Sequence, residues 1–274
     1  MDKAEKLNII CFGAHPDDCE VKVGGIAAKW AKEGHRVKFV SLTNGDIGHI
    51  LFSGYELVKR RIEEAAASAK ILGVEYEILD NHDGELLPTI ENRKLVTKLI
   101  REWKADIVLA PRTNDYHPDH RYTGVIVQDA AFMVVVPQFY PEVTHLARNP
   151  VFMYMEDGFK YPKKFQPDII VQIDDVIEMK MEATLAHVSQ FIERDMILNN
   201  EHINPSPEAF ERARARVREM LVKWFRSAAD KHRKKLIEIY GEERGRKIRF
   251  AEAAELCEYG TRLPKKELQL LFPQ

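Results

Sequence analysis

Cysteine is scarce in this chain, and long apolar runs are missing. Three of the 274 residues are cysteine, with no CxxC pair and no zinc-finger spacing, so neither a disulfide framework nor a metal finger is expected. No apolar run approaches the roughly 18 residues that a bilayer-spanning helix needs. The start, Met1 to Lys6, is charged, and the apolar stretch after it is too short for a secretory signal. We therefore expect a cytoplasmic protein that does not span a membrane.

An excess of charge of either sign is missing as well. The formal net charge is −2, which argues against nucleic-acid binding by the protein as a whole. No GxGxxG motif follows the first strand-like segment and there is no P-loop, so no nucleotide cofactor is expected. The apolar and charged fractions are ordinary, and the chain is long enough for a well-buried core.

Strand-like and helix-like segments alternate along the first half of the chain. Strands are expected at 7–13, 37–42, 76–79 and 107–110, and helices at 23–33, 56–72 and 90–103. This alternation is typical of βαβ units. It predicts an α/β fold with a Rossmann-like, mainly parallel sheet flanked by helices.

The second half is less regular, because several prolines interrupt it between 137 and 167. A strand is expected at 169–173, a helix at 176–191, and a charged, strongly helical stretch from 207 to about 240. The apolar stripe of that stretch should pack on the body of the protein or on a partner subunit, and we expect a homo-oligomer.

No internal repeat or clear linker divides the chain. We predict a single domain, 1–274, that consists of an α/β core, 1–190, and a helical C-terminal extension, 191–274.

Two of the predicted strands are each followed by a loop rich in histidine and aspartate. The strand at 7–13 runs into Ala14-His15-Pro16-Asp17-Asp18-Cys19-Glu20, and the strand at 107–110 precedes His117-Pro118-Asp119-His120. Sites in parallel α/β folds form outside the carboxyl ends of strands, so these loops converge if the two strands are neighbours. Imidazole and carboxylate are zinc ligands, and a catalytic zinc keeps one position open for water. The pattern predicts a metal hydrolase.

Each loop also has a simpler interpretation. Asp18 or Glu20 alone could cap the next helix, and the second loop has the composition of a surface turn. The presence of both loops in one chain favours the metal site. In an extended segment the side chains of Asp17 and Asp18 would point apart, so one could bind metal while the other faces the reacting water.

The second loop offers several candidate groups. If His120 binds the metal, His117 is left near the open coordination position, and Asp119 could orient His117 through an imidazole N–H. Asp83 follows a strand-like segment and could lie near the same sheet edge. Five other histidines are isolated, and we expect them to be structural or solvated: His35, His145, His187, His202 and His232.

The two motifs, with Gly24-Gly25 after the first and Ala110-Pro111 before the second, resemble the signature of the PIG-L / LmbE-like deacetylases. The similarity covers roughly the first 190 residues and fades in the C-terminal third. Members of this family are zinc-dependent enzymes that remove N-acetyl groups, mostly from N-acetylglucosamine derivatives. The resemblance therefore implies that activity and one zinc ion per chain.

The resemblance also implies a role for each site residue. The zinc ligands of the family correspond to His15, Asp18 and His120, and its general base corresponds to Asp17. Its histidine that stabilises or protonates the tetrahedral intermediate corresponds to His117, with Asp119 behind it. Arg61 matches an arginine that contacts the substrate, and its alternative is a surface ion pair with Glu64.

We expect an N-deacetylase that acts on an N-acetylglucosamine-type sugar or conjugate, with a small amino sugar as its partner. A second hypothesis is an amidase for a larger amide, such as a sugar–thiol conjugate. A non-catalytic metal- or sugar-binding protein is a third, and an iron oxygenase a fourth, because two histidines and a carboxylate also suit Fe(II). Asp17 disfavours the third hypothesis, since binding alone requires no base, and Asp17 together with the predicted parallel sheet disfavours the fourth.

Overall fold

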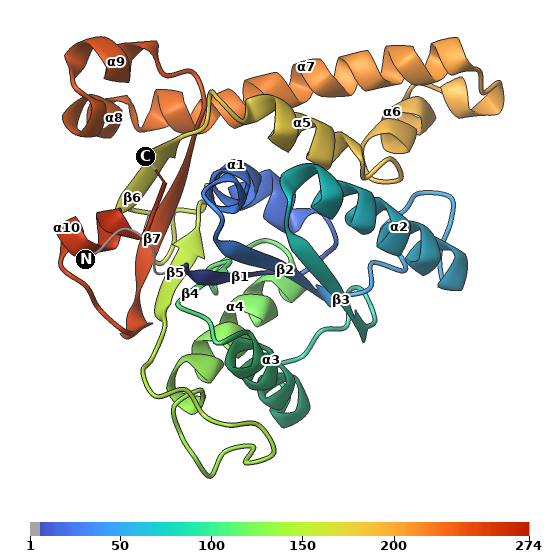
Figure 1. Ribbon diagram of the computed structural model, residues 1–274. Helices are drawn as coiled ribbons and strands as arrows, with labels where there is room; N and C mark the ends of the chain where they lie inside the picture. The colour runs from blue at the N-terminus through green and yellow to red at the C-terminus, as the bar shows by residue number, and fades with distance from the viewer. Residues whose placement is uncertain (1–5, 274) are drawn as a thin grey trace.

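The computed structural model describes residues 6–273, which form a seven-stranded sheet with helices on both faces (Figure 1). The strand order is β3-β2-β1-β4-β5-β7-β6; the first five strands run parallel, and β7 is antiparallel to both neighbours. The strands are β1 (Asn8–Gly13), β2 (Arg36–Thr43), β3 (Glu75–Asn81), β4 (Ile107–Ala110), β5 (Val151–Met155), β6 (Ile169–Gln172) and β7 (Ala251–Gly260).

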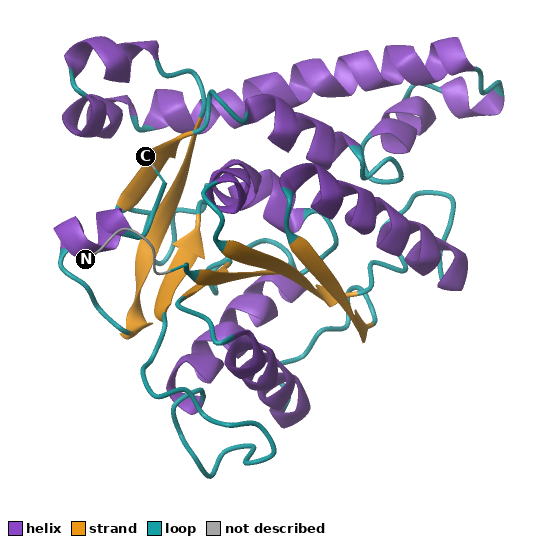
Figure 2. Cartoon of the chain, in the orientation of Figure 1, coloured by secondary structure: helices purple, strands orange, loops and turns teal. Residues whose placement is uncertain are grey.

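Helices cover both faces of this sheet. Figures 1 and 2 show α3 and α4 on one face, α1, α2 and α5 on the other, and the long α7 lying across α5 and α6. The helices are α1 (Asp18–Lys32), α2 (Tyr55–Leu72), α3 (Ile90–Trp103), α4 (Pro118–Met133), α5 (Ile177–Leu185), α6 (Ile192–Leu198), α7 (Pro207–Lys231), α8 (Arg233–Tyr240), α9 (Glu242–Lys247) and α10 (Lys265–Leu270). A short 3-10 helix covers Glu201–Ile203.

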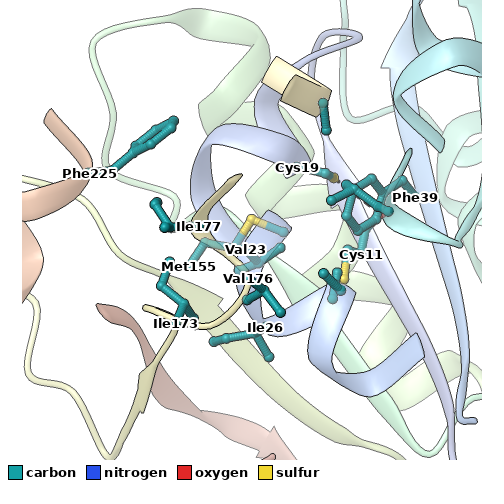
Figure 3. Packing of buried hydrophobic residues seen from close by; sticks show 14 of the residues in the cluster. Cys11, Cys19, Val23, Ile26, Phe39, Met155, Ile173, Val176, Ile177 and Phe225 are labelled. Carbon is teal, nitrogen blue, oxygen red and sulfur yellow. Dashed lines mark hydrogen bonds between the residues drawn. The ribbon is translucent and has the colours of Figure 1, made fainter. Parts of the chain in front are cut away.

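The apolar runs of the sequence account for the core. Strand β1 is buried on both faces, as its continuous apolar run predicts for a central parallel strand. One core cluster joins β1 to α1, α5 and α7, and Figure 3 shows part of it, with Val23 and Ile26 of α1 near Ile173 and Val176. A second cluster fills the opposite face, under α3 and α4. The two cores fix α1 and α4, the helices that carry the histidine and aspartate motifs.

The predicted α/β class is confirmed, and most predicted elements of the first half are present. The helix expected at 90–103 and the strand at 107–110 have the predicted bounds. The helix expected at 23–33 begins already at Asp18, and the helix expected at 176–191 spans only Ile177–Leu185. The C-terminal stretch from Pro207 to Tyr240 is helical, with a break at His232.

The helix α4 and the strands β5 and β7 were not predicted. The segment 191–274 is therefore not simply a helical extension, because β7 lies in the main sheet between β5 and β6. Its sequence, rich in alanine and glutamate, favours a helix by local propensity. Pairing with β5 and β6 overrides that preference, since strand formation depends on neighbouring strands and burial.

The remaining sequence expectations concern the chain as a whole. All three cysteines are free and buried. Between residues 6 and 273, no helix has the length and apolar character needed to cross a bilayer. The charged start of the chain, on which the expectation about a secretory signal depends, lies mostly in residues 1–5, outside the described part.

Candidate functional site

The two motif-bearing strands are neighbours in the sheet. Strands β1 and β4 pair in parallel, with Ile9 opposite Ile107 and Cys11 opposite Leu109, and β2 flanks β1 on the other side. The strand order thus changes direction between β1 and β4, which is where parallel α/β sheets bind ligands. The two loops meet there as expected: the ring centroid of His15 lies 4.7 Å from that of His117 and 5.1 Å from that of His120.

Asp18 is the first residue of α1, and its side chain fixes the loop after β1. One carboxylate oxygen accepts hydrogen bonds from the backbone N–H groups of Ala14 and His15, at 2.9 Å each. Asp17 precedes the helix with φ 144° and makes no side-chain capping bond. The sequence suggested that Asp17 and Asp18 lie in an extended segment, and the structure differs. A strained backbone at Asp17, directly before the helix, separates the two side chains.

Three ligand-type atoms of the predicted metal site face one another. Nδ1 of His15 lies 3.5 Å from Oδ2 of Asp18 and 3.2 Å from Nε2 of His120, and these last two atoms are 3.4 Å apart. One ring nitrogen of His117 also belongs to this cluster, within 4.8 Å of ligand atoms of His15 and His120. The arrangement can hold a metal ion, because histidine nitrogens and a carboxylate oxygen converge on one point.

Carboxylates lie behind the other ring nitrogen of both histidines. Nε2 of His15 is 3.1 Å from Asp83 and 3.3 Å from Asp119, and Nδ1 of His120 is 3.1 Å from Asp115. Such carboxylates fix the ring orientation and tautomer of histidines that bind metals. The sequence raised Asp83 as a neighbour of the site but missed Asp115, whose only signal was its place in the loop after β4.

Asp119 does not take the position that the sequence suggested. Its carboxylate contacts His15 and accepts backbone N–H bonds from Gly84 (2.7 Å) and Leu86 (3.2 Å). Its own backbone N–H donates to Nδ1 of His117 at 3.2 Å. His117 is therefore oriented by the main chain of Asp119, because His117 is the N-cap residue of α4. As Nδ1 accepts a hydrogen bond, the neutral imidazole carries its proton on Nε2.

The charges of the cluster are strongly coupled. Burial alone would lower the pKa of His15, but hydrogen bonds to Asp119, Asp18 and Asp83 outweigh it and raise the pKa well above its usual value. Burial would raise the pKa of Asp18, yet His120 and His15 hold it far below the usual range. Burial lowers the pKa of His117, and the neighbouring His15 and His120 lower it further. His117 is thus the neutral imidazole of the group at physiological pH.

Asp17 lies beside a buried arginine. Arg61 is 1% exposed, and its Nη2 lies 3.4 Å from Oδ2 of Asp17 and donates to the carbonyl of Pro16. Burial raises the pKa of Asp17 to about 6, although the positive charge of Arg61 opposes this shift. The alternative surface pair of Arg61 with Glu64 does not form, since Glu64 accepts bonds from the backbone N–H and hydroxyl of Ser189, at 2.8 and 2.7 Å.

A second buried polar group lies beneath the first loop. Glu20 and His187 are both fully buried, with Nε2 of His187 2.8 Å from Oε1 of Glu20. The same oxygen accepts a 2.7 Å bond from the hydroxyl of Ser68. His187 is thus structural, as the sequence analysis expected of the isolated histidines. The pair connects α1 to the segment after α5, below Asp17.

The cluster opens into a large cleft of about 670 Å³. Its inner end is lined by the histidines and aspartates described above, with Arg61 and Gly48. Tyr116 borders the cluster, with Phe159 beside it, and residues of α6 and α7 form the outer end. A site of this size and polarity suits a small organic substrate better than the edge of a macromolecule.

Comparison with known proteins identifies relatives of this chain. The family model "PIG-L: GlcNAc-PI de-N-acetylase" matches residues 10–131. Over 191 residues the chain is 37% identical to a diacetylchitobiose deacetylase of Thermococcus kodakarensis, covering 68% of this chain and 70% of the relative. It is 27% identical over 235 residues to a mycothiol S-conjugate amidase of Streptomyces coelicolor, covering 76% and 79%.

Solved structures agree with these matches. The N,N'-diacetylchitobiose deacetylase of Pyrococcus horikoshii superposes with a TM-score of 0.68 and 26% identity, over 91% of this chain and 83% of that one. The 37% identity to the Thermococcus enzyme extends over more than two thirds of each chain, which is enough to place both proteins in one family. The chain belongs to the PIG-L family of deacetylases.

Proposed function

We propose that this protein is a zinc-dependent hydrolase that removes the N-acetyl group from an N-acetylglucosamine-type sugar or conjugate. The observation that carries this proposal is the triangle of Nδ1 of His15, Oδ2 of Asp18 and Nε2 of His120, whose sides measure 3.2 to 3.5 Å. Ligands bound tetrahedrally at about 2.0–2.1 Å from zinc lie roughly 3.3–3.4 Å apart. The three atoms thus have the spacing that one zinc ion per chain requires.

The surroundings of these atoms support the same assignment. Asp83 and Asp119 face the outer nitrogen of His15, and Asp115 faces that of His120. With a raised pKa, His15 holds a proton when no metal is bound, so a metal ion would take the place of that positive charge among the carboxylates. A donor set of two imidazoles and one carboxylate leaves a fourth position for water or substrate.

Each remaining side chain has a chemical task in amide hydrolysis. Zinc, when bound, polarises the amide carbonyl and makes water a stronger acid. Asp17 accepts a proton from the attacking water. His117, neutral with its proton on Nε2, donates a hydrogen bond to the oxygen that becomes negative. When the carbon–nitrogen bond breaks, Asp17 returns the proton to the amine, and acetate and a free amino sugar are released.

The family resemblance gives His117 the role of stabilising or protonating the tetrahedral intermediate, and the local charges favour the neutral form of its imidazole. A neutral imidazole still offers one N–H, and it does not repel a metal ion. Because the amine then cannot take its proton from an imidazolium at position 117, Asp17 is the better candidate for the final proton transfer. Asp119 contributes by orienting both His15 and His117.

The other hypotheses make different demands on the site. A larger amide substrate, as the name of the Streptomyces relative states for that protein, would use the same residues and differ only in the outer cleft. A non-catalytic binding protein would not need a carboxyl group with a raised pKa beside the metal site. A cytoplasmic location and a homo-oligomeric state remain predictions from the sequence.

An assay of amine release separates these possibilities. The protein is freed of metal with a chelator, reloaded with zinc, and offered N-acetylglucosamine, its β-linked oligomers and its conjugates. We expect free amine and acetate in equal amounts, with activity lost on chelation and regained with about one zinc per chain. Zinc binding without amine release from any of these compounds would favour the binding-protein hypothesis. Undiminished activity in the chelated protein would contradict the metal-dependent mechanism.

A further inference from the structure

Two charged side chains from the second half of the chain bond to the backbone of α1. The carboxylate of Glu252 in β7 accepts hydrogen bonds from the N–H groups of Gly25 and Ile26, at 2.9 and 2.7 Å. The ammonium group of Lys180 in α5 donates to the carbonyl of Val21 at 2.8 Å. In a regular helix, the N–H of Gly25 would bond this same carbonyl. The two side chains thus bind the donor and the acceptor of one step in the hydrogen-bond ladder of α1.

Lys180 and Glu252 also form a buried ion pair. Nζ of Lys180 lies 2.5 Å from Oε1 of Glu252, and the two residues are 2% and 3% exposed. The same Nζ lies 4.0 Å from the ring centroid of Phe225. Burial lowers the pKa of Lys180, and the charge of Glu252 opposes this shift. Because apolar side chains of similar volume often stabilise a core as well as a buried ion pair does, stability alone does not account for these two charges.

Two glycines that follow the first motif allow this contact. A Cβ atom at Gly25 would lie 2.7–2.9 Å from side-chain atoms of Ile173, which is too close for non-bonded carbon atoms. A Cβ atom at Gly24 would lie 3.5 Å from Cγ of Lys180. Figure 3 shows Ile173, the residue directly after β6, near Ile26 of α1. Gly25 therefore lets the segment after β6 approach the backbone of α1.

The carbonyl that Lys180 binds belongs to the turn of α1 that carries the candidate site. Val21 follows Asp18 by three residues, and its own N–H donates to the carbonyl of Asp17 at 3.1 Å. A single residue thus connects the ammonium group of Lys180 to the main chain of Asp17. Asp17 has a φ of 144°, a strained value that a residue other than glycine keeps only where its surroundings enforce it. The contacts of Lys180 and Glu252 with α1 are part of these surroundings.

We propose that Lys180 and Glu252 form a clamp that holds the first two turns of α1 in the geometry that places Asp17 and Asp18 at the metal site. This inference rests on the proposed deacetylase function. Neither side chain of the clamp lines the main cleft, so both are positioning residues that act through α1. Both also lie outside the segment 10–131 that the family model matches. The clamp thus gives the C-terminal strand β7 a part in forming the site.

Two variants weaken the clamp by different means. Glu252→Asp keeps the charge of the ion pair but shortens the side chain by one methylene group, so the carboxylate no longer reaches both N–H groups of α1. The double variant Lys180→Met with Glu252→Gln removes both charges together and leaves no unpaired ion in the core. The control is Leu236→Ala, which opens a cavity in the separate core cluster beneath α8. Urea unfolding measures the stability of each protein, and every assay is run at a temperature at which all are folded.

We expect both clamp variants to lose properties that the control keeps. Zinc affinity, measured by competition with a chelator, should fall about tenfold, because the turn that bears Asp18 is no longer fixed. At saturating zinc, kcat for the best substrate of the amine-release assay should fall by about 10- to 100-fold, with KM within about twofold of the wild type. Displaced catalytic groups slow the reaction without removing substrate contacts. Leu236→Ala should match the wild type in all three quantities.

Hydrogen exchange of the metal-free proteins gives a readout that needs neither zinc nor turnover. Exchange in residues 18–26 is compared with exchange in α3 of the same protein. In the clamp variants, residues 18–26 should exchange at least about tenfold faster relative to α3 than they do in the wild type, because local opening of α1 becomes easier. In Leu236→Ala the ratio of the two rates should stay as it is in the wild type.

The outcomes separate this proposal from the deacetylase function. Wild-type zinc affinity, kcat and exchange ratio in Glu252→Asp and in the double variant would overturn the clamp and leave the deacetylase function standing. An equal loss of zinc affinity and kcat in Leu236→Ala would also overturn it, since any loss of stability would then have the same effect. Without amine release by the wild type, the proposed function fails, and zinc affinity and hydrogen exchange still decide about the clamp. If the double variant does not fold, Glu252→Asp decides, because it retains the ion pair.

Discussion

One carboxylate oxygen of Asp119 lies 3.3 Å from Nε2 of His15, while Nδ1 of the same ring faces Asp18 and His120. The carboxylate therefore acts on the metal site through the ring of His15. The backbone N–H of Asp119, rather than its side chain, donates a hydrogen bond to Nδ1 of His117. We therefore expect a substitution of Asp119 to change the zinc affinity. A carboxylate that oriented only His117 would change kcat and leave the zinc affinity as it is.

Asp119→Asn should weaken zinc binding by about 10- to 100-fold, because the substitution removes the charge behind His15. Competition with a chelator of known affinity measures the change. The control is Asp129→Asn on the same helix, where the aspartate pairs with Arg93 away from the site. Unchanged zinc affinity with a reduced kcat would instead assign Asp119 to His117 alone.

Asp17→Asn should retain zinc and lower kcat by roughly 10² or more, the usual effect of losing a general base. The wild-type pH profile follows from the same residue. The raised pKa of Asp17, about 6, means that the carboxyl takes up a proton below that pH. Since a protonated carboxyl cannot accept the proton of water, kcat/KM should fall as pH drops through this range. A kcat close to that of the wild type in the variant would show that another group is the base.

Arg61→Ala should destabilise the fold as well as lower kcat/KM. The structure buries the guanidinium of Arg61 beside the carboxylate of Asp17. Removal of one partner of a buried ion pair typically costs about 3–5 kcal/mol. Urea unfolding measures this cost. Arg60→Ala is the matched control, because Arg60 is partly exposed and its ion pair with Glu193 should contribute only about 0–1 kcal/mol.

The kinetic effect of Arg61 is measured at temperatures where the variant is folded. We expect kcat/KM to fall by on the order of tenfold to a thousandfold, because Arg61 positions Asp17 and borders the cleft. Arg61→Lys keeps the charge but loses the planar fork, so it should recover stability more than activity. A stable Arg61→Ala variant with normal kcat/KM would contradict both roles.

His187→Gln should alter how stability depends on pH. Burial alone lowers the pKa of His187, but Glu20 outweighs it and raises the pKa above the usual value. The charged pair therefore stabilises the fold fully below the unfolded pKa of about 6.5, and this contribution is lost as pH rises through the higher folded pKa. The free energy of unfolding of the wild type should approach that of the variant as the pH rises above the unfolded pKa of about 6.5. A difference that stays constant over this range would show that His187 is neutral in the fold.

Much of the site was predictable because its residues are close in sequence to strand ends. Apolar runs at 7–13 and 107–110 marked two buried strands, and the residues after them were bound to lie at one edge of a parallel sheet. The candidates His15, Asp17, Asp18, His117 and His120 followed from that edge. Asp115 was missed because its contact with His120 depends on the conformation of the loop before α4, which no local sequence pattern specifies.

Local periodicity and short motifs were enough to predict the α/β class, the order of the first strands and helices, and the chemical character of the site. Features that depend on distant contacts became visible only in the folded protein. The tertiary structure placed β7 between β5 and β6, although the local composition favours a helix, and there buried Glu252 against Lys180 and the backbone of α1. It also turned Asp119 toward His15, since burial and pairing across the fold outweigh local preference.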